Sequence, residues 1–584
     1  MNTPNDAFEA LAEFNRKLAE QAVGPLLQAS GLDAAEIFKS LAAGVAHDTE
    51  RWQEIQNDYY RGQLELWSGT AAAGGNPAVN AAADAAQSDR RFKAPEWQEP
   101  YFKTLAQSYL LTARWINQLV DHASLEAHAK KKLAFFAQQM VDAMSPANYA
   151  WSNPEALKLA AQTQGESVVR GMKNLNRDLD KGLVSMTDDS AFEVGGNLAI
   201  TPGAVVFEND FFQLIQYRPA TATVYQRPLL MVPPCINKYY ILDLQPQNSY
   251  VRYALGEGHT VFMMSWRNMP EDMGRATWDD YIEQGVITAI DAVTEICGAD
   301  QINVLGFCVG GTLLASALAV LRAKGRRPAA SLTLLATMLD FSDTGQLSVF
   351  IDEAYAQLRE HDFAQGGLVR GRELALTFAS LRANELIWHY VVNNYLKGNT
   401  PEPFDLLYWN GDGSNLPGAM YAYYVRNMYL ENNLRTPGKL RMCGVPVDLG
   451  RIELPSYVLA AREDHIVPWK TAYSSMRLLG DRMEFVLTAS GHIAGVINPV
   501  SRNRRNYWLN SGSADDPEQW LASAESHPGS WWAHWSKWLA QHGGSRLDAR
   551  TALGGGRHAE IEPAPGRYVS VREKRAGAAG RSEA

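Results

Sequence analysis

Apolar side chains recur at three- and four-residue steps through the first third of the chain, a spacing that predicts amphipathic helices. One such face, close to the N-terminus, contains Phe8, Leu11, Phe14 and Leu18. The periodicity returns after Trp97 and continues to about residue 182. Between these stretches, residues 69–88 are mostly Ala, Gly and Asn, which predicts a flexible connector or a weakly ordered insert. We therefore expect an α-helical region over residues 1–195.

The pattern changes near residue 195, where short apolar runs begin to alternate with helical stretches. The runs that predict strands lie at 228–234, 260–266, 302–307, 331–339, 456–461 and 483–490. Strands separated by helices need crossover connections, so their sheet is expected to be mostly parallel and covered by helices on both faces. The predicted fold class is therefore α/β, over residues 196–545.

A long insertion interrupts this alternation. More than a hundred residues separate the strand that ends near 339 from the one that begins at 456. Such a length is too great for one crossover, and the segment is rich in Phe, Tyr and Trp. It predicts a cap, inserted over the strand ends at about 342–450.

The C-terminal part of the chain shows two patterns. Trp531, Trp535 and Trp538 share one helical stripe, which predicts a closing helix packed on the sheet. Beyond it, the tail at 546–584 is rich in Gly, Ala and Arg and is expected to be mobile, apart from a short docked piece around IEPAPGRYV.

Composition narrows the classes of function. The 584 residues are too many for one ordinary core, and a net charge of −10 argues against a nucleic-acid partner. The chain has only four cysteines, widely spaced, so neither a disulfide framework nor a paired-cysteine zinc site is expected, and no metal site is predicted. A reducing cytoplasm is the expected location.

Targeting and membrane segments are not expected either. The N-terminus lacks the positive and apolar regions of a secretory signal. Residues 304–321 carry no charge, but internal glycines separate a strand-like part from a helix-like part. This segment therefore predicts a buried strand, turn and helix rather than a transmembrane span.

The strongest chemical signal is the run Gly306-Phe307-Cys308-Val309-Gly310-Gly311. It follows an apolar strand and precedes a helix, as a nucleophile elbow does, with cysteine in the position of serine. The N-terminus of the following helix favours a thiolate on Cys308. Cys308 is therefore the predicted nucleophile.

Chain order supplies the partners of Cys308. In folds with this elbow, an acid follows a later strand and a histidine follows the last one. Here Asp464 follows the strand at 456–461, and His492 follows the strand at 483–490. His465 as the base and Glu463 as the acid are less favoured alternatives that the sequence leaves open.

An oxyanion hole needs backbone N–H donors. The amide of Val309, directly after the nucleophile, is the first candidate. The second is expected from the loop after the strand at 228–234, where Ile236 is favoured over Cys235 and Asn237. Cys235 lacks an elbow of its own, which weighs against it as a second nucleophile.

A cysteine nucleophile suits acyl transfer, because the thioester it forms keeps the transfer potential of a thioester substrate. An acyl-CoA is therefore the expected substrate class, with His492 as base and Asp464 as its orienting acid. An aromatic cap would keep water from the acyl-enzyme. Two other hypotheses are a thiol-dependent hydrolase, either a thioesterase or a polymer depolymerase, and a scaffold protein without catalysis.

Several motifs together resemble the class I polyhydroxyalkanoate synthases, over about residues 95–568. They are GFCVGGT, MVPPCINKYYILDLQP, SWRN, TWDDYI, NYLKGNTPEPFDLLYWNGD, GKLRMCGVPVDL, REDHIVPW and GHIAGVINP. The resemblance implies an α/β-hydrolase fold with an inserted cap and a preceding helical domain. It also implies polymerisation of (R)-3-hydroxyacyl-CoA, typically 3-hydroxybutyryl-CoA, with release of CoA and no separate cofactor.

The same resemblance assigns roles and partners. It implies that Cys308 carries the growing polyester chain, that His492 is the base, and that Asp464 either orients His492 or activates the substrate hydroxyl. Phe404 and Trp409 are implied to lie near dimer contacts or the active site. The implied partners are a second copy of the chain, the surface of cytoplasmic polymer granules and granule-associated proteins.

Overall fold

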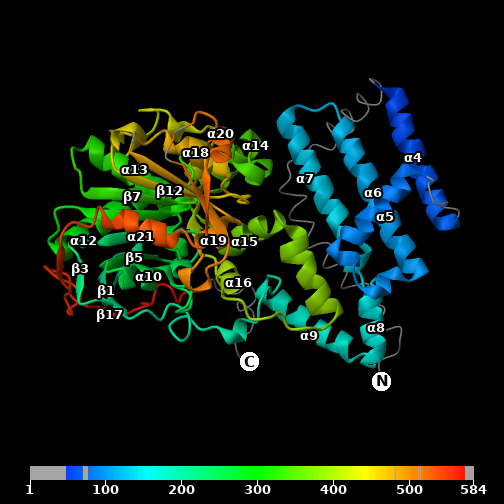
Figure 1. Ribbon diagram of the computed structural model, residues 1–584, viewed down its shortest axis with the longest axis horizontal. Helices are drawn as coiled ribbons and strands as arrows, with labels where there is room; N and C mark the ends of the chain where they lie inside the picture. The colour runs from blue at the N-terminus through cyan, green and yellow to red at the C-terminus, as the bar shows by residue number, and fades with distance from the viewer. Residues whose placement is uncertain (1–47, 70–75, 481, 511, 513, 573–584) are drawn as a thin grey trace. The chain divides into compact units, whose positions relative to one another are not determined.

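A computed structural model describes residues 48–69, 76–480, 482–510, 512 and 514–572 (Figure 1). These residues form two compact units. The first, which is helical, contains the described residues up to Met186 together with Leu376–Glu402, and the second contains Thr187–Ala375 and the described residues from Pro403 onward. The amphipathic face predicted around Phe8 lies outside the described residues.

The first unit is built from helices, as predicted for the N-terminal region. They are α4 (Thr49–Ser68), α5 (Pro77–Ser88), α6 (Pro100–His122), α7 (Ala127–Ala143), α8 (Pro154–Gln162) and α9 (Glu166–Lys181). Helix α6 packs against α4, α5 and α7. Around it, Phe92, Trp97 and Tyr109 form one buried cluster with Val141.

The prediction of a flexible connector is wrong for residues 77–88, which form helix α5. Asn76 caps this helix by accepting a hydrogen bond from the Ala78 amide, and Pro77 occupies its first turn. Val79 and Ala82 are buried on one face. Alanine has the highest helix propensity, so the composition that indicated a connector also supports a helix once one face packs.

Residues Leu376–Glu402, inside the predicted insertion, belong to the helical unit. Val391 and Tyr395 lie in a buried cluster with Leu175 of α9. The Tyr395 hydroxyl donates a hydrogen bond to Asp178 at 2.8 Å. A Cβ on Gly171 would lie 1.8 Å from the Tyr395 carbonyl oxygen, so glycine allows this close approach.

The second unit is organised around an eleven-stranded sheet with the order β15-β14-β13-β12-β7-β6-β4-β5-β2-β1-β17. Its strands are β1 (Gly203–Glu208), β2 (Phe212–Tyr217), β4 (Leu229–Val232), β5 (Val261–Trp266), β6 (Ile302–Phe307), β7 (Ala329–Leu335), β12 (Ser456–Ala461), β13 (Met483–Thr488), β14 (Asn506–Leu509), β15 (Glu525–Pro528) and β17 (Glu562–Pro563). The six central strands from β5 to β13 are mutually parallel. The predicted mostly parallel sheet is confirmed, with antiparallel strands added at both edges.

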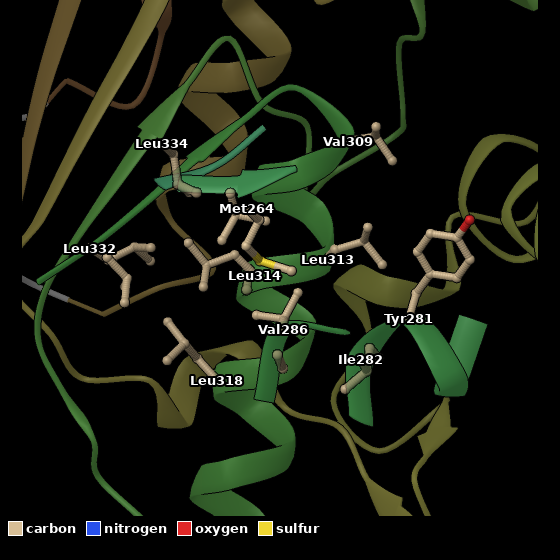
Figure 2. Close-up of a cluster of buried hydrophobic side chains, with 14 of the residues drawn as sticks. Met264, Tyr281, Ile282, Val286, Val309, Leu313, Leu314, Leu318, Leu332 and Leu334 are labelled. Atoms are coloured by element: carbon tan, nitrogen blue, oxygen red, sulfur yellow. The ribbon is translucent and has the colours of Figure 1, made fainter. Parts of the chain in front are cut away.

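Both faces of the central strands are apolar, because helices cover each of them. In β6, Val304 faces one buried cluster, whereas Leu305 and Phe307 face the other. Figure 2 shows the first cluster, in which α13 (Val309–Ala323) lies between strand residues such as Met264 and the π-helical segment Tyr281–Ile287. The uncharged stretch 304–321 therefore forms a buried strand, turn and helix, as predicted.

The remaining helices of the second unit cover the sheet or form the insertion (Figure 1). They are α10 (Tyr250–Gly256), α11 (Trp278–Asp280), α12 (Thr288–Cys297), α14 (Glu353–Asp362), α15 (Gly371–Ser380), which begins in this unit, α16 (Asp405–Asn410), α17 (Gly418–Tyr424), α18 (Trp469–Met476), α19 (His492–Val496), α20 (Pro517–Ala522) and α21 (Trp532–Ala540). Helix α21 confirms the predicted closing helix, since Trp531 and Trp535 are fully buried against the sheet. None of the helices in the described ranges is long and apolar enough to cross a membrane.

The expectation of a mobile tail is wrong for residues 546–572. Strand β16 (Arg546–Asp548) pairs with β3 (Thr223–Tyr225), and β17 pairs with β1 at the sheet edge. Val569 is buried in the core. The predicted docked piece around IEPAPGRYV is confirmed. Residues 546–548 are held by strand pairing, which composition does not reveal.

Candidate active site

Cys308 occupies a sharp corner between strand and helix. Strand β6 ends at Phe307 and α13 begins at Val309, and Cys308 between them has φ 53° and ψ −128°. A positive φ in a residue with a side chain is strained, and such strain concentrates at functional sites. The Cys308 amide donates a hydrogen bond to the Leu335 carbonyl at 2.9 Å, which fixes the corner to β7. Its side chain is partly exposed.

Glycine at position 310 lets the corner approach the neighbouring strand. A Cβ on Gly310 would lie 2.4 Å from the Val232 carbonyl oxygen and 2.5 Å from that of Pro233. Neither backbone atom can move without displacing β4 or the loop after it. The elbow is therefore pressed against the loop that was predicted to supply the second oxyanion donor.

We expect Gly310→Ala to lower the free energy of unfolding by about 1–3 kcal/mol through this overlap. Gly256→Ala is the matched control, because a Cβ there has nothing within 4 Å and its φ is not positive. Urea unfolding of both variants measures the difference. Equal stability of the two variants would contradict the role of Gly310 at the elbow.

Asp464 and His492 are brought together as predicted. His492, the first residue of α19, has its Nδ1 2.6 Å from Asp464 Oδ2. The other carboxylate oxygen, Oδ1, accepts hydrogen bonds from the amides of Ile466 and Val467 at 2.8 and 2.9 Å. Both side chains are buried. The backbone therefore holds the carboxylate in the orientation that the imidazole requires.

The imidazole of His492 is also positioned by its neighbours. Its ring stacks on Phe307, the residue before the predicted nucleophile, with the ring centres 5.6 Å apart. Burial alone lowers the pKa of His492, but the charges of Asp464 and Cys308 and hydrogen bonds to both side chains raise it to about 10. Cys308, His492 and Asp464 thus form one interacting set.

The raised pKa of His492 predicts a pH dependence of stability. The charged ring contributes stability that is fully present below its ordinary pKa of 6.5 and is lost as the pH rises through about 10. Between these values, the wild type should lose free energy of unfolding faster than His492→Gln. Urea denaturation from pH 6 to pH 10 measures both slopes. Parallel curves would contradict the assignment of this proton to His492.

The alternatives for the acid and the base are Glu463 and His465. Glu463 is exposed, and its amide donates a hydrogen bond to the Ser490 carbonyl. His465 lies on the same loop as Asp464, with its carbonyl oxygen facing Gly345. Because both oxygens of Asp464 are already engaged, the geometry favours Asp464 and His492 over Glu463 and His465.

The loop after β4 is held by the insertion. The Ile236 carbonyl accepts a hydrogen bond from the Ser414 amide at 2.9 Å, and Asn237 forms a bridge with Gly413. Val309 begins α13, and the first amides of a helix have no partner within the helix. The amides of Val309 and Ile236 remain the predicted oxyanion donors.

The other three cysteines are poor candidates for a nucleophile. Burial raises the pKa of Cys235, Cys297 and Cys443 to about 12 each. A thiol with such a pKa is protonated at neutral pH and therefore weakly nucleophilic. Cys235 also lies near Cys308, whose charge adds to the rise.

The two candidate residues of the cap occupy different environments. Trp409 in α16 is buried, and its Nε1 donates a hydrogen bond to the Lys238 carbonyl at 2.6 Å. It thereby connects the insertion to the loop after β4. Phe404 is 45% exposed, and its amide donates a hydrogen bond to the Thr187 hydroxyl. The implied location of Phe404 and Trp409 near dimer contacts or the active site stays a prediction.

Two tyrosines near Cys308 were not singled out by the sequence. Tyr424 and Tyr429 form an aromatic cluster with Phe341, with ring centres 5.1 to 6.0 Å apart. Burial raises the pKa of both phenols, and the nearby Cys308 raises it further. The insertion contains many aromatics without a common period, so only the fold shows which of them approach Cys308.

In the described parts of the chain, no group of three His, Cys, Asp or Glu side chains is arranged to hold a metal ion. At Cys308, the described residues provide a thiol beside an imidazole and a carboxylate. Such a set can form and pass on a covalent acyl group.

Comparison with known proteins identifies the family. A family model described as "Poly-beta-hydroxybutyrate polymerase (PhaC) N-terminus" matches residues 88–254, and a model of the alpha/beta hydrolase fold matches residues 228–499. The Cupriavidus necator protein "Poly(3-hydroxyalkanoate) polymerase subunit PhaC" is 52% identical over 549 residues, covering 93% of this chain and 91% of that protein.

Two further relatives match at similar coverage. The protein of the same name from Rhizobium meliloti is 40% identical, over 90% of this chain and 86% of its own length. The "Poly(3-hydroxyalkanoate) polymerase" of Methylorubrum extorquens is 38% identical, over 94% and 93%. The chain therefore belongs to the class I poly(3-hydroxyalkanoate) polymerases of the α/β-hydrolase fold, and it is an acyltransferase.

Proposed function

We propose that this polymerase joins (R)-3-hydroxyacyl units, with 3-hydroxybutyryl-CoA as the expected substrate, through a thioester on Cys308. The observation that carries the proposal is the hydrogen-bonded pair of His492 and Asp464 beside a cysteine at a strand-to-helix corner. The similarity to a family of polymerases supports polymerisation as the reaction. Cys308, His492 and Asp464 are the groups proposed to carry it out.

In the first step, the thiolate of Cys308 attacks the carbonyl carbon of the acyl-CoA. A bond forms between Cys308 Sγ and that carbon, and the bond from the carbon to the sulfur of CoA breaks. An imidazolium at His492 favours the thiolate beforehand and gives its proton to the departing CoA sulfur. The amides of Val309 and Ile236 are proposed to stabilise the oxyanion.

In the second step, a 3-hydroxyl group attacks the thioester on Cys308. Acylation removes the charge of Cys308, which is one cause of the raised pKa of His492, so the imidazole is then more easily neutral. A neutral His492 accepts the hydroxyl proton as a new ester bond forms and the Cys308 thiolate leaves. Acylation of Cys308 thus lowers the pKa of His492 and favours its role as the base.

Asp464 is proposed to orient His492 rather than to deprotonate the substrate hydroxyl. One of its oxygens is bound to His492 and the other to two backbone amides. A carboxylate with both oxygens engaged and buried has little freedom to reach a substrate. It can fix the tautomer of the ring and stabilise the imidazolium.

No cofactor is proposed, because CoA enters as part of the substrate and leaves as a product. The further proposals are that the chain acts as a homodimer on the surface of polyester granules in the cytoplasm, with granule-associated proteins as neighbours. They rest on the resemblance of the motifs, including those that contain Phe404 and Trp409. Light scattering of the purified chain, with and without substrate, tests the dimer.

Purified protein with 3-hydroxybutyryl-CoA tests the proposed function. We expect free CoA together with polymer that sediments. CoA accompanied only by monomeric 3-hydroxybutyrate would instead indicate a thioesterase, and loss of added polymer without CoA chemistry would indicate a depolymerase. Full CoA release by Cys308→Ala would revive the scaffold hypothesis, because it would remove any need for Cys308 as the nucleophile.

A further inference from the structure

A cavity lies at the edge of the sheet opposite to Cys308. It has a volume of about 340 Å³ and is bordered by residues just before the parallel strands β6, β7, β12 and β13. Gln301, Pro328 and Pro455 mark the starts of the first three. Cys308, Asp464 and His492 follow the opposite, carboxyl ends of these strands, so this cavity is separate from the candidate active site.

Helix α13 connects the two locations. Val309 opens the helix at the elbow, and Leu318, nine residues later, lines the cavity. At 1.5 Å per residue the two positions are about 14 Å apart along the helix axis. Both residues belong to α13, and Figure 2 labels their side chains. The cavity is therefore not a continuation of the candidate active site.

The lining is strongly basic. Four arginines, Arg322, Arg326, Arg327 and Arg482, face one carboxylate, that of Glu453, among the described residues that line the cavity. Arg322 already pairs with Glu453 at 2.5 Å. The negative charge of the lining is thus compensated by a single arginine.

The remaining arginines differ in what holds them. Arg326 pairs with Asp291, outside the lining. Arg327 and Arg482 form no ion pair with any carboxylate of the described residues. Arg482 is nevertheless oriented, because its Nη2 donates a hydrogen bond to the Glu453 carbonyl at 2.7 Å. Two guanidinium groups that have no ion pair among the described residues therefore border one cavity.

We infer that this cavity is a binding site for a small phosphorylated anion, held by Arg327 and Arg482. Guanidinium groups match phosphate oxygens in a two-pronged geometry, and two of them suit a ligand with at least two negative charges. The volume is at the lower end of the range for small-molecule sites. His542, whose pKa is lowered by burial and by Arg482, adds a neutral ring that can donate a hydrogen bond.

The test is isothermal titration of the full chain with inorganic pyrophosphate at low ionic strength. We expect a Kd below about 1 mM for the wild type and at least tenfold weaker binding for Arg327→Gln/Arg482→Gln. Arg557→Gln is the matched control, because Arg557 is exposed, pairs with Glu295 and does not line the cavity. It should bind pyrophosphate as the wild type does.

Three results would overturn the inference: no binding to the wild type, equal weakening by the control, or unchanged binding by the double variant. Circular dichroism establishes that the variants fold. If the double variant does not fold, Ala330→Glu, which places a carboxylate in the lining, replaces it and should also weaken binding tenfold. Orthophosphate carries fewer negative charges than pyrophosphate, so it should bind more weakly in a parallel titration.

Discussion

Replacing Cys308 with alanine is expected to reduce CoA release from 3-hydroxybutyryl-CoA by at least about a thousandfold, because it removes the thiol that is proposed to form the covalent intermediate. Cys235, the nearby alternative, is a buried thiol whose pKa is raised to about 12 by burial. Cys308→Ser should also lose most of the activity, since an oxyester is a poorer acyl donor than a thioester. Thiol detection with a chromogenic disulfide measures the release.

The control for these variants is Cys443→Ala, which removes a thiol that is distant in sequence and also has a pKa raised by burial to about 12. It should keep nearly full activity. Turnover of Cys308→Ser close to that of the wild type would refute the argument from thioester transfer potential. Mass spectrometry of the quenched wild-type reaction should find the acyl group on the peptide that contains Cys308.

Asp464→Asn is expected to lower the rate of CoA release by about a hundred- to ten-thousandfold, by analogy with the loss of the acid in other triads. An amide at position 464 removes the charge that raises the pKa of His492 and permits the wrong tautomer. The pKa of His492 should therefore fall. Proton NMR titration of the ring and the pH profile of turnover measure this change.

Glu463→Gln is the matched control for Asp464→Asn, because Glu463 is the exposed neighbour on the same loop. It should leave both the rate and the titration of His492 unchanged. The rate at which iodoacetamide alkylates Cys308 gives an independent measurement. If the imidazole of His492 no longer favours the thiolate, this rate should fall. A variant at 464 with normal alkylation and a normal His492 titration would contradict the orienting role.

The parallel strands and the order of the site residues could be predicted from the sequence for one physical reason. Strands buried on both faces are continuous apolar runs, as in β6 and β12, where every residue is buried. Each such run ends at the same edge of the sheet, so the residues that follow it converge. This convergence places His492 Nδ1 2.6 Å from Asp464 Oδ2.

The edge strands lack this signal. Strand β2 contains Gln213 and Gln216, which are buried but polar, and Gln213 donates a hydrogen bond to Glu208. The residues of β14 are half-buried throughout, and those of β15 are mostly exposed. Without an apolar run or a strict alternation, hydrogen bonding to a neighbouring strand alone defines these elements.

Tertiary partners also explain why the insertion was harder to interpret than the sheet. The segment Leu376–Glu402 has a helical pattern, but its apolar face fits Leu175 and its neighbours, which are two hundred residues earlier. Tyr429, in the insertion, lies near Cys308, although more than a hundred residues separate them in the chain. Neither contact can be predicted from the residues adjacent in sequence.

The pairing of β17 with β1 has a consequence for the solubility of the protein. Strand β1 would otherwise end the sheet with unpaired N–H and C=O groups, which are a template for association with another chain. The two residues of β17 and the loop after them occupy that edge, and the Arg567 guanidinium pairs with Glu208 of β1. The C-terminal segment therefore shields this edge of the sheet against edge-to-edge association with another chain.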